Sequence, residues 1–466
     1  MLTFTPITLE HHALLRRYYG GCDYRLCEYS AGTKLMWSLY LRPAFTEVAG
    51  CLVIRNRIDG QWAFDFPVPA PEGGDIDAAL TAIEDYCTDT DTPLVISVVP
   101  EQQAPRLLLR WPRLQVSSER NWKDYLYHAE DLAAFAGRRY SGQRNHINKF
   151  RKTYPQARFV PLSGEDMPLI EAFWEDYETE FQKTSFNAKR ELAYAKALAR
   201  LLPEGWLLGG GLEVDGRLVA LSLAECCGET LIIHVEKALY SHPGAYPTIV
   251  QSFAAHYGAG CHWINREDDA GDRGLRTSKL QYLPAELAGK LRLEARCELD
   301  RLREVPTIPT ARLRLTPLED RDEAAYNALC LDDARNRWWG YDYRQDLKGE
   351  LTEDYFLTVA RRDFAARRAV NFAVRLDGHL IGEVVLYRFD WKGGAELGCR
   401  IDPAYAGQGY GTEAFTAAAE WALFSLSLTR VKAKCYKENH ASYRMLSSCM
   451  RPAGEDETFY YFEKLV

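Results

Sequence analysis

Apolar and polar positions follow a regular order near the carboxyl end of the chain. Residues 395–401 form a short apolar run of the kind found in strands. From Thr412 to Leu426 apolar residues recur at helical spacing, and residues 430–436 alternate again like a strand. Between the first strand and the helix lies a loop with three spaced glycines, Gly407, Gly409 and Gly411. The pattern predicts strand, glycine loop, helix and strand.

This loop suits a phosphate group. Glycine lacks a Cβ atom, so the main chain can adopt positive φ there and bring its N–H groups close to a ligand. The helix that follows leaves its first N–H groups unpaired and carries a partial positive charge at its start. The loop is therefore a candidate cradle for a phosphate or pyrophosphate. Glu413 would repel such a group, so we expect its side chain to point away.

A second pattern repeats along the chain. Asp-Gly turns between strand-like runs are typical of β-hairpins, and they occur at residues 59–60, 215–216 and 377–378. The turns are separated by about one third of the 466 residues. In the second and third copies a strand, a Gly-bearing loop, a helix and another strand follow. The first copy leaves space for one strand fewer before its helix.

The repeats predict three modules, at residues 1–120, 121–300 and 311–466. Residues 304–310 contain two prolines between helical and strand-like stretches and are the best candidate for a linker. A softer boundary lies near residues 117–121. The predicted fold class is α/β (α+β), with mixed central sheets flanked by helices.

Composition narrows the class of protein. The chain is 47% hydrophobic and 26% charged, as soluble globular proteins are, and its net charge of −8 argues against wholesale coating of nucleic acid. No apolar run reaches about 18 residues, and no secretory leader pattern is present. The 12 cysteines lack metal-ligand spacing. We expect a cytoplasmic protein with reduced cysteines, no structural metal and no membrane span.

The C-terminal pattern resembles the Gcn5-related N-acetyltransferases, and especially the branch that acetylates ribosomal-protein N-termini and amino sugars. The family motif Arg/Gln-x-x-Gly-x-Gly/Ala falls on residues 406–411, with Ala406 in its first position. The resemblance covers residues 311–466 and implies an acetyl-CoA-dependent enzyme that transfers acetyl to a small-molecule or peptide amine. It implies cofactor contacts from Cys399, Ile401, Gly407, Gln408, Gly409, Tyr410, Gly411, Thr412, Asn439 and Ser442.

Acetyl transfer needs a deprotonated amine and a protonated leaving thiolate. Glu396, which opens the strand before the loop, is the first candidate for the base, and a solvent-facing carboxylate is the alternative reading. Glu383, in the preceding hairpin, is the second candidate. Tyr443 could protonate the thiolate, but Leu446 stands where the family usually has a Tyr acid, so packing or cofactor contact is its other role.

An aromatic loop precedes the C-terminal sheet. Aromatic side chains more often fill cores than bind ligands. Two adjacent tryptophans cannot both point inward from one helix face, however, so at least one is a candidate for the wall of an acceptor site. The candidates are Trp338, Trp339 and Tyr341.

The middle module carries polar clusters. Residues 138–152 have six basic residues and no acidic one, and a helix there would form either a surface for a phosphate-bearing partner or a solvated face. Polar residues 264–279 follow a predicted strand, where α/β sheets commonly bind ligands. Charges also end the strand at residues 235–237. Together the clusters predict a cleft.

These clusters resemble the catalytic C-terminal region of phosphatidylglycerol lysyltransferases, across most of residues 1–290. The resemblance implies two fused acetyltransferase-like folds and transfer of an aminoacyl group from a charged tRNA to an amine or hydroxyl. It places substrate contacts at Arg144, Asn148, Glu236, Lys237, Tyr246, Asn265, Arg266, Glu267, Arg276 and Lys279. The loop at residues 243–244 lacks a Gly-x-Gly pair, so acetyl-CoA is not expected there. The alternative is that this half binds tRNA or protein without catalysis.

Overall fold

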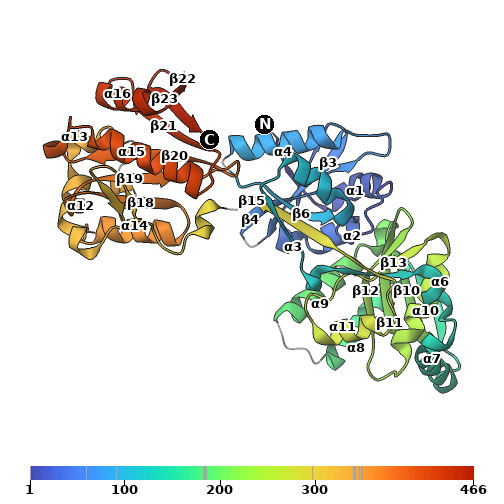
Figure 1. Cartoon of the computed structure of the whole chain (residues 1–466). Coiled ribbons are helices and arrows are strands. Elements are labelled where there is room, and N and C mark those ends of the chain that lie inside the picture. Colours follow the sequence, from blue (N-terminus) through green and yellow to red (C-terminus); the bar gives the residue numbers. More distant parts are fainter. Residues whose placement is uncertain are drawn as a thin grey trace. The chain divides into compact units, whose positions relative to one another are not determined.

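The computed structural model describes residues 2–58, 60–90, 92–181, 186–295, 297–339, 343–345, 347 and 350–466. The chain divides into two compact units, Met1–Glu294 and Ala295–Val466 (Figure 1). The described residues form three mixed sheets, two in the first unit and one in the second, with helices packed beside them. The predicted fold class is therefore confirmed.

The first sheet has the strand order β1-β2-β3-β4-β6-β15-β7, with β5 paired to β3. Only β4 and β6 run parallel within it, and the neighbouring ladders that the structure describes are antiparallel. Its strands are β1 (Thr5–Pro6), β2 (Ala44–Val48), β3 (Cys51–Ile58), β4 (Gln61–Asp65), β5 (Val68–Pro69), β6 (Val95–Pro100), β7 (Leu114–Ser117) and β15 (Lys290–Ala295). The helices of this part are α1 (His12–Tyr19), α2 (Ala31–Met36), α3 (Ser38–Leu41), α4 (Ile76–Asp89) and α5 (Ala104–Arg110).

The second sheet has the order β14-β8-β13-β12-β11-β10-β9. Its strands are β8 (Asp124–His128), β9 (Arg158–Leu162), β10 (Leu208–Val214), β11 (Arg217–Cys227), β12 (Thr230–Ala238), β13 (Trp263–Asn265) and β14 (Glu286–Ala288). The helices of this part are α6 (Ala129–Ala134), α7 (Ser141–Thr153), α8 (Met167–Glu180), α9 (Phe186–Ala199), α10 (Ala245–Tyr257) and α11 (Arg273–Leu280). The predicted basic helix is α7, which buries Ile147 and Phe150 and exposes Lys149, Arg151 and Lys152.

The first unit is held together by β15, which returns to the first sheet after the chain has formed the second sheet. β15 follows every strand of the second sheet in sequence, yet it pairs with β6 of the first sheet. The first sheet is therefore complete only when the chain has passed through the second. This connection explains why Met1–Glu294 forms one compact unit although the sequence repeats within it.

The third sheet has the order β16-β17-β18-β19-β20-β21-β23-β22. Its strands are β16 (Ile308–Pro309), β17 (Arg314–Thr316), β18 (Ala369–Leu376), β19 (His379–Tyr387), β20 (Gly394–Ile401), β21 (Arg430–Tyr436), β22 (Arg451–Glu455) and β23 (Phe459–Leu465). Its helices are α12 (Glu323–Leu331), α13 (Asp333–Asn336), α14 (Tyr355–Ala365), α15 (Tyr410–Glu420) and α16 (His440–Cys449), and α15 continues into a π-helical turn, Trp421–Ser425. The predicted order of strand, loop, helix and strand is confirmed as β20, loop, α15 and β21.

The Asp-Gly turns form as predicted where the structure describes them. Asp215 and Gly216 have φ values of 52° and 78°, and Asp377 and Gly378 have 50° and 86°, the left-handed values that tight hairpins require. Asp59 lies outside the described residues, but β3 and β4 on either side of it pair antiparallel.

The predicted equivalence of the first turn is wrong by one strand. After each of the later turns one further antiparallel strand, β12 or β20, follows the hairpin before the sheet meets its parallel neighbour. The turn after Ile58 joins the last two strands of the run β2-β3-β4, which then meets β6 in parallel. This shift explains why the sequence left space for one strand fewer between the first Asp-Gly turn and α4.

Residues 304–310 are not a free linker. The second unit already begins at Ala295, and Val305 and Ile308 pack against its core. Ile308–Pro309 forms β16 at the edge of the sheet. Proline is tolerated in an edge strand because its missing N–H faces no neighbour, so the two prolines did not signal a boundary.

Candidate functional site

The third sheet opens between β20 and β21. The two strands pair in parallel at Gly394–Arg430, Ala395–Val431 and Glu396–Lys432, and the described residues form no β20–β21 pair beyond these. β20 nevertheless continues to Ile401 and β21 to Tyr436. The edge of β20 that faces β21 is therefore unpaired from Leu397 onward. This wedge is a place where a ligand could bind to free main-chain groups of β20.

The glycine loop lies at the end of β20. Gly407 and Gly409 have φ values of 77° and 81°, and Gly409 is the N-cap of α15. A Cβ atom at Gly407 would meet no neighbour within 4 Å, so the loop is open there. Within the described part of the chain, the main-chain N–H groups of residues 407–411 have no hydrogen-bond acceptor. The loop and the helix start together offer several free donors to an anion.

The third glycine has a packing role. A Cβ atom at Gly411 would lie 3.4 Å from Ile401 Cγ1 and 3.6 Å from Met445 Sδ. Gly411 therefore brings the start of α15 close to β20 and α16. Cys399 packs at the same place, with its thiol 3.9 Å from the Gly411 carbonyl oxygen, and burial raises the pKa of Cys399 to about 12.

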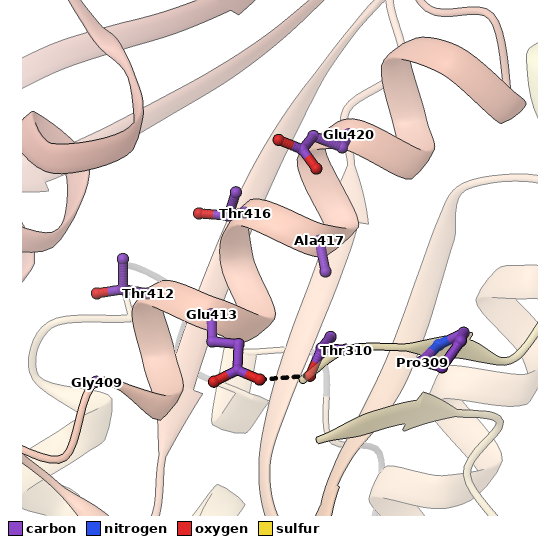
Figure 2. A pocket seen from close by; sticks show the side chains of 8 residues that line it. All are labelled: Pro309, Thr310, Gly409, Thr412, Glu413, Thr416, Ala417 and Glu420. Carbon is purple, nitrogen blue, oxygen red and sulfur yellow. Dashed lines mark hydrogen bonds between the residues drawn. The ribbon is translucent and has the colours of Figure 1, made fainter. Parts of the chain in front are cut away.

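Arg312 neutralises Glu413, a carboxylate close to the loop, and nothing in the sequence pattern singled Arg312 out. Its Nε donates to Glu413 Oε2 at 2.7 Å, its Nη1 donates to the Gln408 carbonyl at 3.1 Å, and its guanidinium covers the Tyr410 ring. Thr310 also donates to Glu413, at 2.6 Å, and Figure 2 shows the carboxylate turned toward it. Hydrogen bonds from Thr310 and Arg312 outweigh burial and lower the pKa of Glu413.

A pocket runs along α15 on the side that carries Glu413 (Figure 2). It begins at Gly409 and extends past Thr412 to Glu420, with Pro309 and Thr310 forming its other wall. The opposite side of α15 packs into the core through Ala414, Phe415 and Ala418. The pocket and the β20–β21 wedge therefore meet only at the start of the helix.

Glu396 stands at the mouth of the wedge, in the last residue pair before the strands separate. Its carboxylate accepts hydrogen bonds from the Tyr387 hydroxyl at 2.8 Å and from Arg388 Nη1 at 3.1 Å. Its side chain is 15% exposed, so the carboxylate is fixed yet reachable. This geometry suits a base that acts directly or through one water.

Glu383 lies in a different setting. It is 1% exposed and accepts hydrogen bonds from Tyr326, from Asn371 at 2.6 Å and from Arg400 at 2.8 Å. Every oxygen of this carboxylate is engaged, so its observed role is to hold β18, β19 and β20 to α12. The geometry favours Glu396 over Glu383 as the base.

α16 begins directly after Asn439, one of the predicted cofactor contacts. The Asn439 side chain caps this helix by accepting a hydrogen bond from the Ser442 N–H at 3.1 Å, and Ser442 is half-buried. Tyr443 is 41% exposed and its ring packs against Tyr460 and Phe462. Cofactor contacts of Asn439 and Ser442, and a proton donor at Tyr443, stay predictions.

The two adjacent tryptophans, which follow α13, pack against the two strands that border the wedge. Trp339 covers Gly398 of β20, where an added Cβ would meet its ring at 3.3 Å, and it stacks under Arg400. Trp338 packs against Tyr436 at the end of β21, with ring centroids 5.7 Å apart. Both are half-buried, as walls of a cleft are. Tyr341 lies outside the described residues.

The corresponding wedge of the second sheet is closed by charged pairs. β12 and β13 pair in parallel from Thr230 to Ile232 and then separate, within the residues described. Two side chains of β12 cross the gap to the residues after β13: His234 contacts Glu267 at 3.0 Å, and Glu236 pairs with Arg266. These contacts occupy the gap beside β12.

The loop before α10 is also covered. Gly244 has a φ of 95°, and a Cβ atom there would lie 2.7 Å from the His146 carbonyl and 2.9 Å from Phe150 Cβ of α7. The helix start in this module therefore packs against α7. This packing agrees with the missing Gly-x-Gly pair in the sequence.

Several predicted contacts of the first unit do converge. Arg266 donates to Tyr246 at 2.9 Å and pairs with Glu236, and its guanidinium lies 4.5 Å from the Tyr282 ring. Lys279 donates to the carbonyls of Arg266 and Asp268, which holds the segment after β13 in place. Glu236, Tyr246, Arg266 and Lys279 thus form one cluster in which Arg266 and Lys279 are buried, and Glu267 beside it contacts His234.

The remaining predicted contacts have separate partners. Asn265 donates to Asp124 at 2.8 Å, Lys237 pairs with Glu191 at 2.8 Å, and Arg276 pairs with Asp269 at 2.9 Å. Arg144 donates to the carbonyls at the end of α6, and Asn148 is exposed on α7. The structure therefore does not bring α7 into the cluster around Arg266.

A further buried cluster was not predicted. Lys290 Nζ lies 2.7 Å from Asp124 and from Glu28, and 3.4 Å from Asp268 and from the Cys27 thiol. The thiol and the Glu28 and Asp124 carboxylates are close enough to hold a metal ion, but the lysine ammonium lies among them. Burial, opposed by Lys290, raises the pKa of Glu28 to about 7. No local sequence motif predicts this cluster, because Lys290 lies far along the chain from Glu28 and Asp124 and reaches them only through β15.

Comparisons with known proteins agree with this division. Residues 25–291 match the family model of the phosphatidylglycerol lysyltransferase C-terminal region, and residues 312–449 match that of the acetyltransferase (GNAT) domain. The uncharacterised N-acetyltransferase YnaD of Bacillus subtilis is 36% identical over 125 residues, which are 24% of this chain and 72% of YnaD. None of the helices in the described ranges combines the length and apolar character needed to cross a membrane.

Two further relatives have no assigned function. An uncharacterised protein of Mycoplasmoides gallisepticum is 25% identical over 166 residues, 34% of this chain, and the chain spans about half (52%) of its length. The crystal structure of a conserved protein of unknown function from Bacteroides thetaiotaomicron covers 63% of this chain and 99% of its own, at 29% identity and a TM-score of 0.57. Through residues 25–291, more than half of its length, the chain belongs to the family of the phosphatidylglycerol lysyltransferase C-terminal region, and residues 312–449 make it an acyltransferase of the GNAT family as well.

Proposed function

We propose that the second unit is an acetyl-CoA-dependent N-acetyltransferase that acts on a primary amine. The observation that carries this proposal is the open wedge beside β20 together with the unpaired amides of residues 407–411 at its end. A pyrophosphate fits those amides, and a narrow acyl arm fits the free edge of β20. Arg312, which lies beside Gly409, neutralises the Glu413 carboxylate that would otherwise repel a pyrophosphate.

Acetyl-CoA would supply a thioester whose acetyl group passes to the amine nitrogen, with release of the CoA thiol. The free N–H groups of β20 beyond Glu396 would hold the carbonyl oxygen and stabilise the charge that develops there. Glu396, held by Tyr387 and Arg388, would accept the proton of the attacking amine. Trp338 and Trp339 would form the walls along which the amine approaches.

Replacement of Gly409 tests the cofactor site. Gly409→Val places a β-branched side chain at a φ of 81°, which displaces the amides of the loop, and we expect affinity for acetyl-CoA to fall by more than about tenfold. Gly378→Val is the matched control, because Gly378 has a φ of 86° in a hairpin of the same unit away from the loop. Titration calorimetry measures both. Equal affinity in the Gly409 variant and the wild type would remove the assignment.

We further propose that the first unit transfers an aminoacyl group from a charged tRNA. Its family supports the transfer, the closed β12–β13 gap argues against acyl-CoA as its donor, and the basic surface of α7 suits a phosphate backbone. Incubation of the chain with charged tRNA and amine acceptors is the test. Loss of the aminoacyl group to an acceptor supports transfer, whereas tRNA that binds and stays charged supports the alternative of a binding module.

A further inference from the structure

Alternate residues of β20 and β21 point to opposite faces of the sheet. Ala395, Leu397, Val431, Ala433 and Cys435 pack in the core beneath α15 and α16. The residues between them, including Glu396 and Gly398 on β20 and Lys432 and Lys434 on β21, therefore face the other side. Trp339 lies on this side too, over Gly398. It is the side from which the proposed acceptor reaches the wedge.

Lys434 occupies a particular place on this face. The last β20–β21 pair joins Glu396 to Lys432, so Lys434 is the next residue of β21 on the same face, where the strands have separated. The proposed base and Lys434 thus stand on the two sides of the mouth of the wedge. A group that binds Lys434 would lie close to the amine that Glu396 deprotonates.

The neighbouring charges are paired. Lys432 Nζ lies 2.6 Å from Asp390, Arg388 lies 3.1 Å from Glu396, and Arg451 lies 2.8 Å from Glu463, which is opposite Lys432 on β23. Lys434 differs, because its ammonium lies 4.5 Å from the Phe459 ring and has no carboxylate partner within the described residues. A half-buried cation without a counter-charge favours an anionic ligand.

We propose that Lys434 determines acceptor specificity by binding an anionic group next to the acceptor amine, so that the preferred acceptor is a primary amine with a nearby carboxylate. This inference rests on the acetyltransferase proposed for this unit. The aromatic rings along β21 and β23 support it, since Trp338, Tyr436 and Phe459 pack in a row beside Lys434. They keep water from the ammonium and strengthen its attraction to a carboxylate.

The test uses the full chain, acetyl-CoA and two series of acceptors. Peptides with N-terminal serine carry Asp-Asp, Asn-Asn or Lys-Lys at the next two positions, and small α-amino acids are compared with their amides. For the wild type we expect kcat/KM to be about tenfold higher for the acidic acceptor than for the amide, as one charge-assisted hydrogen bond would give. Comparison of the two series distinguishes a peptide from a small molecule.

Variants of Lys434 locate the effect. Lys434→Gln should equalise the acidic and amide acceptors, and Lys434→Glu should favour the Lys-Lys peptide. Lys464→Gln is the matched control: it removes a lysine from β23 that pairs with Glu420 of α15, on the other face of the sheet, and should keep the wild-type preference. A preference that is absent in the wild type, or that survives in Lys434→Gln, would overturn the inference alone. Failure to acetylate any acceptor would overturn the proposed function as well.

Discussion

Glu396 shows how position decides the role of a carboxylate. Glu383 and Glu396 face the same side of neighbouring strands, but Glu383 is sealed by Tyr326, Asn371 and Arg400. Glu396 is held by two partners and keeps a reachable edge at the mouth of the wedge. The sequence placed both on strands, but it could not show which one was enclosed, because Tyr326 comes from α12, Asn371 from β18 and Arg400 from the far end of β20.

Replacement of Glu396 therefore separates catalysis from binding. Glu396→Gln keeps the size of the side chain and one accepting oxygen, but it cannot accept a proton, so kcat for acetyl transfer should fall by about 100-fold or more. Acetyl-CoA affinity should stay as in the wild type, because the loop of residues 407–411 is unchanged. Thiol release at saturating acetyl-CoA measures the first quantity and calorimetry the second. Glu420→Gln, on the exposed side of α15, is the control. Full activity in Glu396→Gln would exclude it as the base.

At the scale of elements, two pairs of strands that start in parallel and then separate differ in what occupies the gap between them. Both β12–β13 and β20–β21 begin in parallel and then separate. In the first unit His234 and Glu236 fill the gap through Glu267 and Arg266. In the second unit the equivalent gap is lined by Gly398 and free main-chain groups. Side chains of β12 thus cross the gap in the first unit, whereas Gly398 of β20 contributes none to the gap in the second unit.

The bridge through His234 makes the first unit sensitive to pH. Burial disfavours the charged imidazole, but hydrogen bonds with Glu225 and Glu267 outweigh burial and raise the pKa of His234 to about 9, above its unfolded value of 6.5. The bridge therefore contributes its full stability below pH 6.5 and loses it as the pH rises through 9. The free energy of unfolding should fall by about 3 kcal/mol across that window.

Urea unfolding of the first unit between pH 6 and pH 9.5 checks this expectation. His234→Gln should remove most of the pH dependence, whereas His262→Gln, an exposed histidine of the same unit, should keep it. An unfolding free energy that stays constant across the window in the wild type would show that the bridge is not charged in the folded state.

At the scale of the whole molecule, local features were predictable and long-range pairings were not. Asp-Gly turns, the glycine loop and the helical spacing of α15 each depend on a stretch of about 20 residues or fewer. The hairpins, the loop and the helix therefore formed where the sequence predicted them. β15 pairs with β6 across nearly 200 positions, and Lys290 meets Glu28 and Asp124 only through that pairing. Arg312 and Glu413 likewise come from different elements. Such contacts depend on the completed fold, which spacing in the sequence does not encode.

The two units also differ in the reaction proposed for them, acetyl transfer for the second and aminoacyl transfer for the first. The open wedge and free amides occur in the second unit, and the closed gap and covered loop occur in the first. We therefore predict an acyl-CoA site beside β20 of the third sheet and none at the β12–β13 gap of the second sheet. Each site can then be inactivated by substitutions that leave the core of the other unit intact.

Calorimetric titration of the full chain with acetyl-CoA tests whether the second unit holds the acyl-CoA site. We predict one binding site per chain, with the same stoichiometry in His234→Gln and an affinity more than about tenfold lower in Gly409→Val. Absence of binding to the wild type, or a second site that persists in the Gly409 variant, would contradict the account.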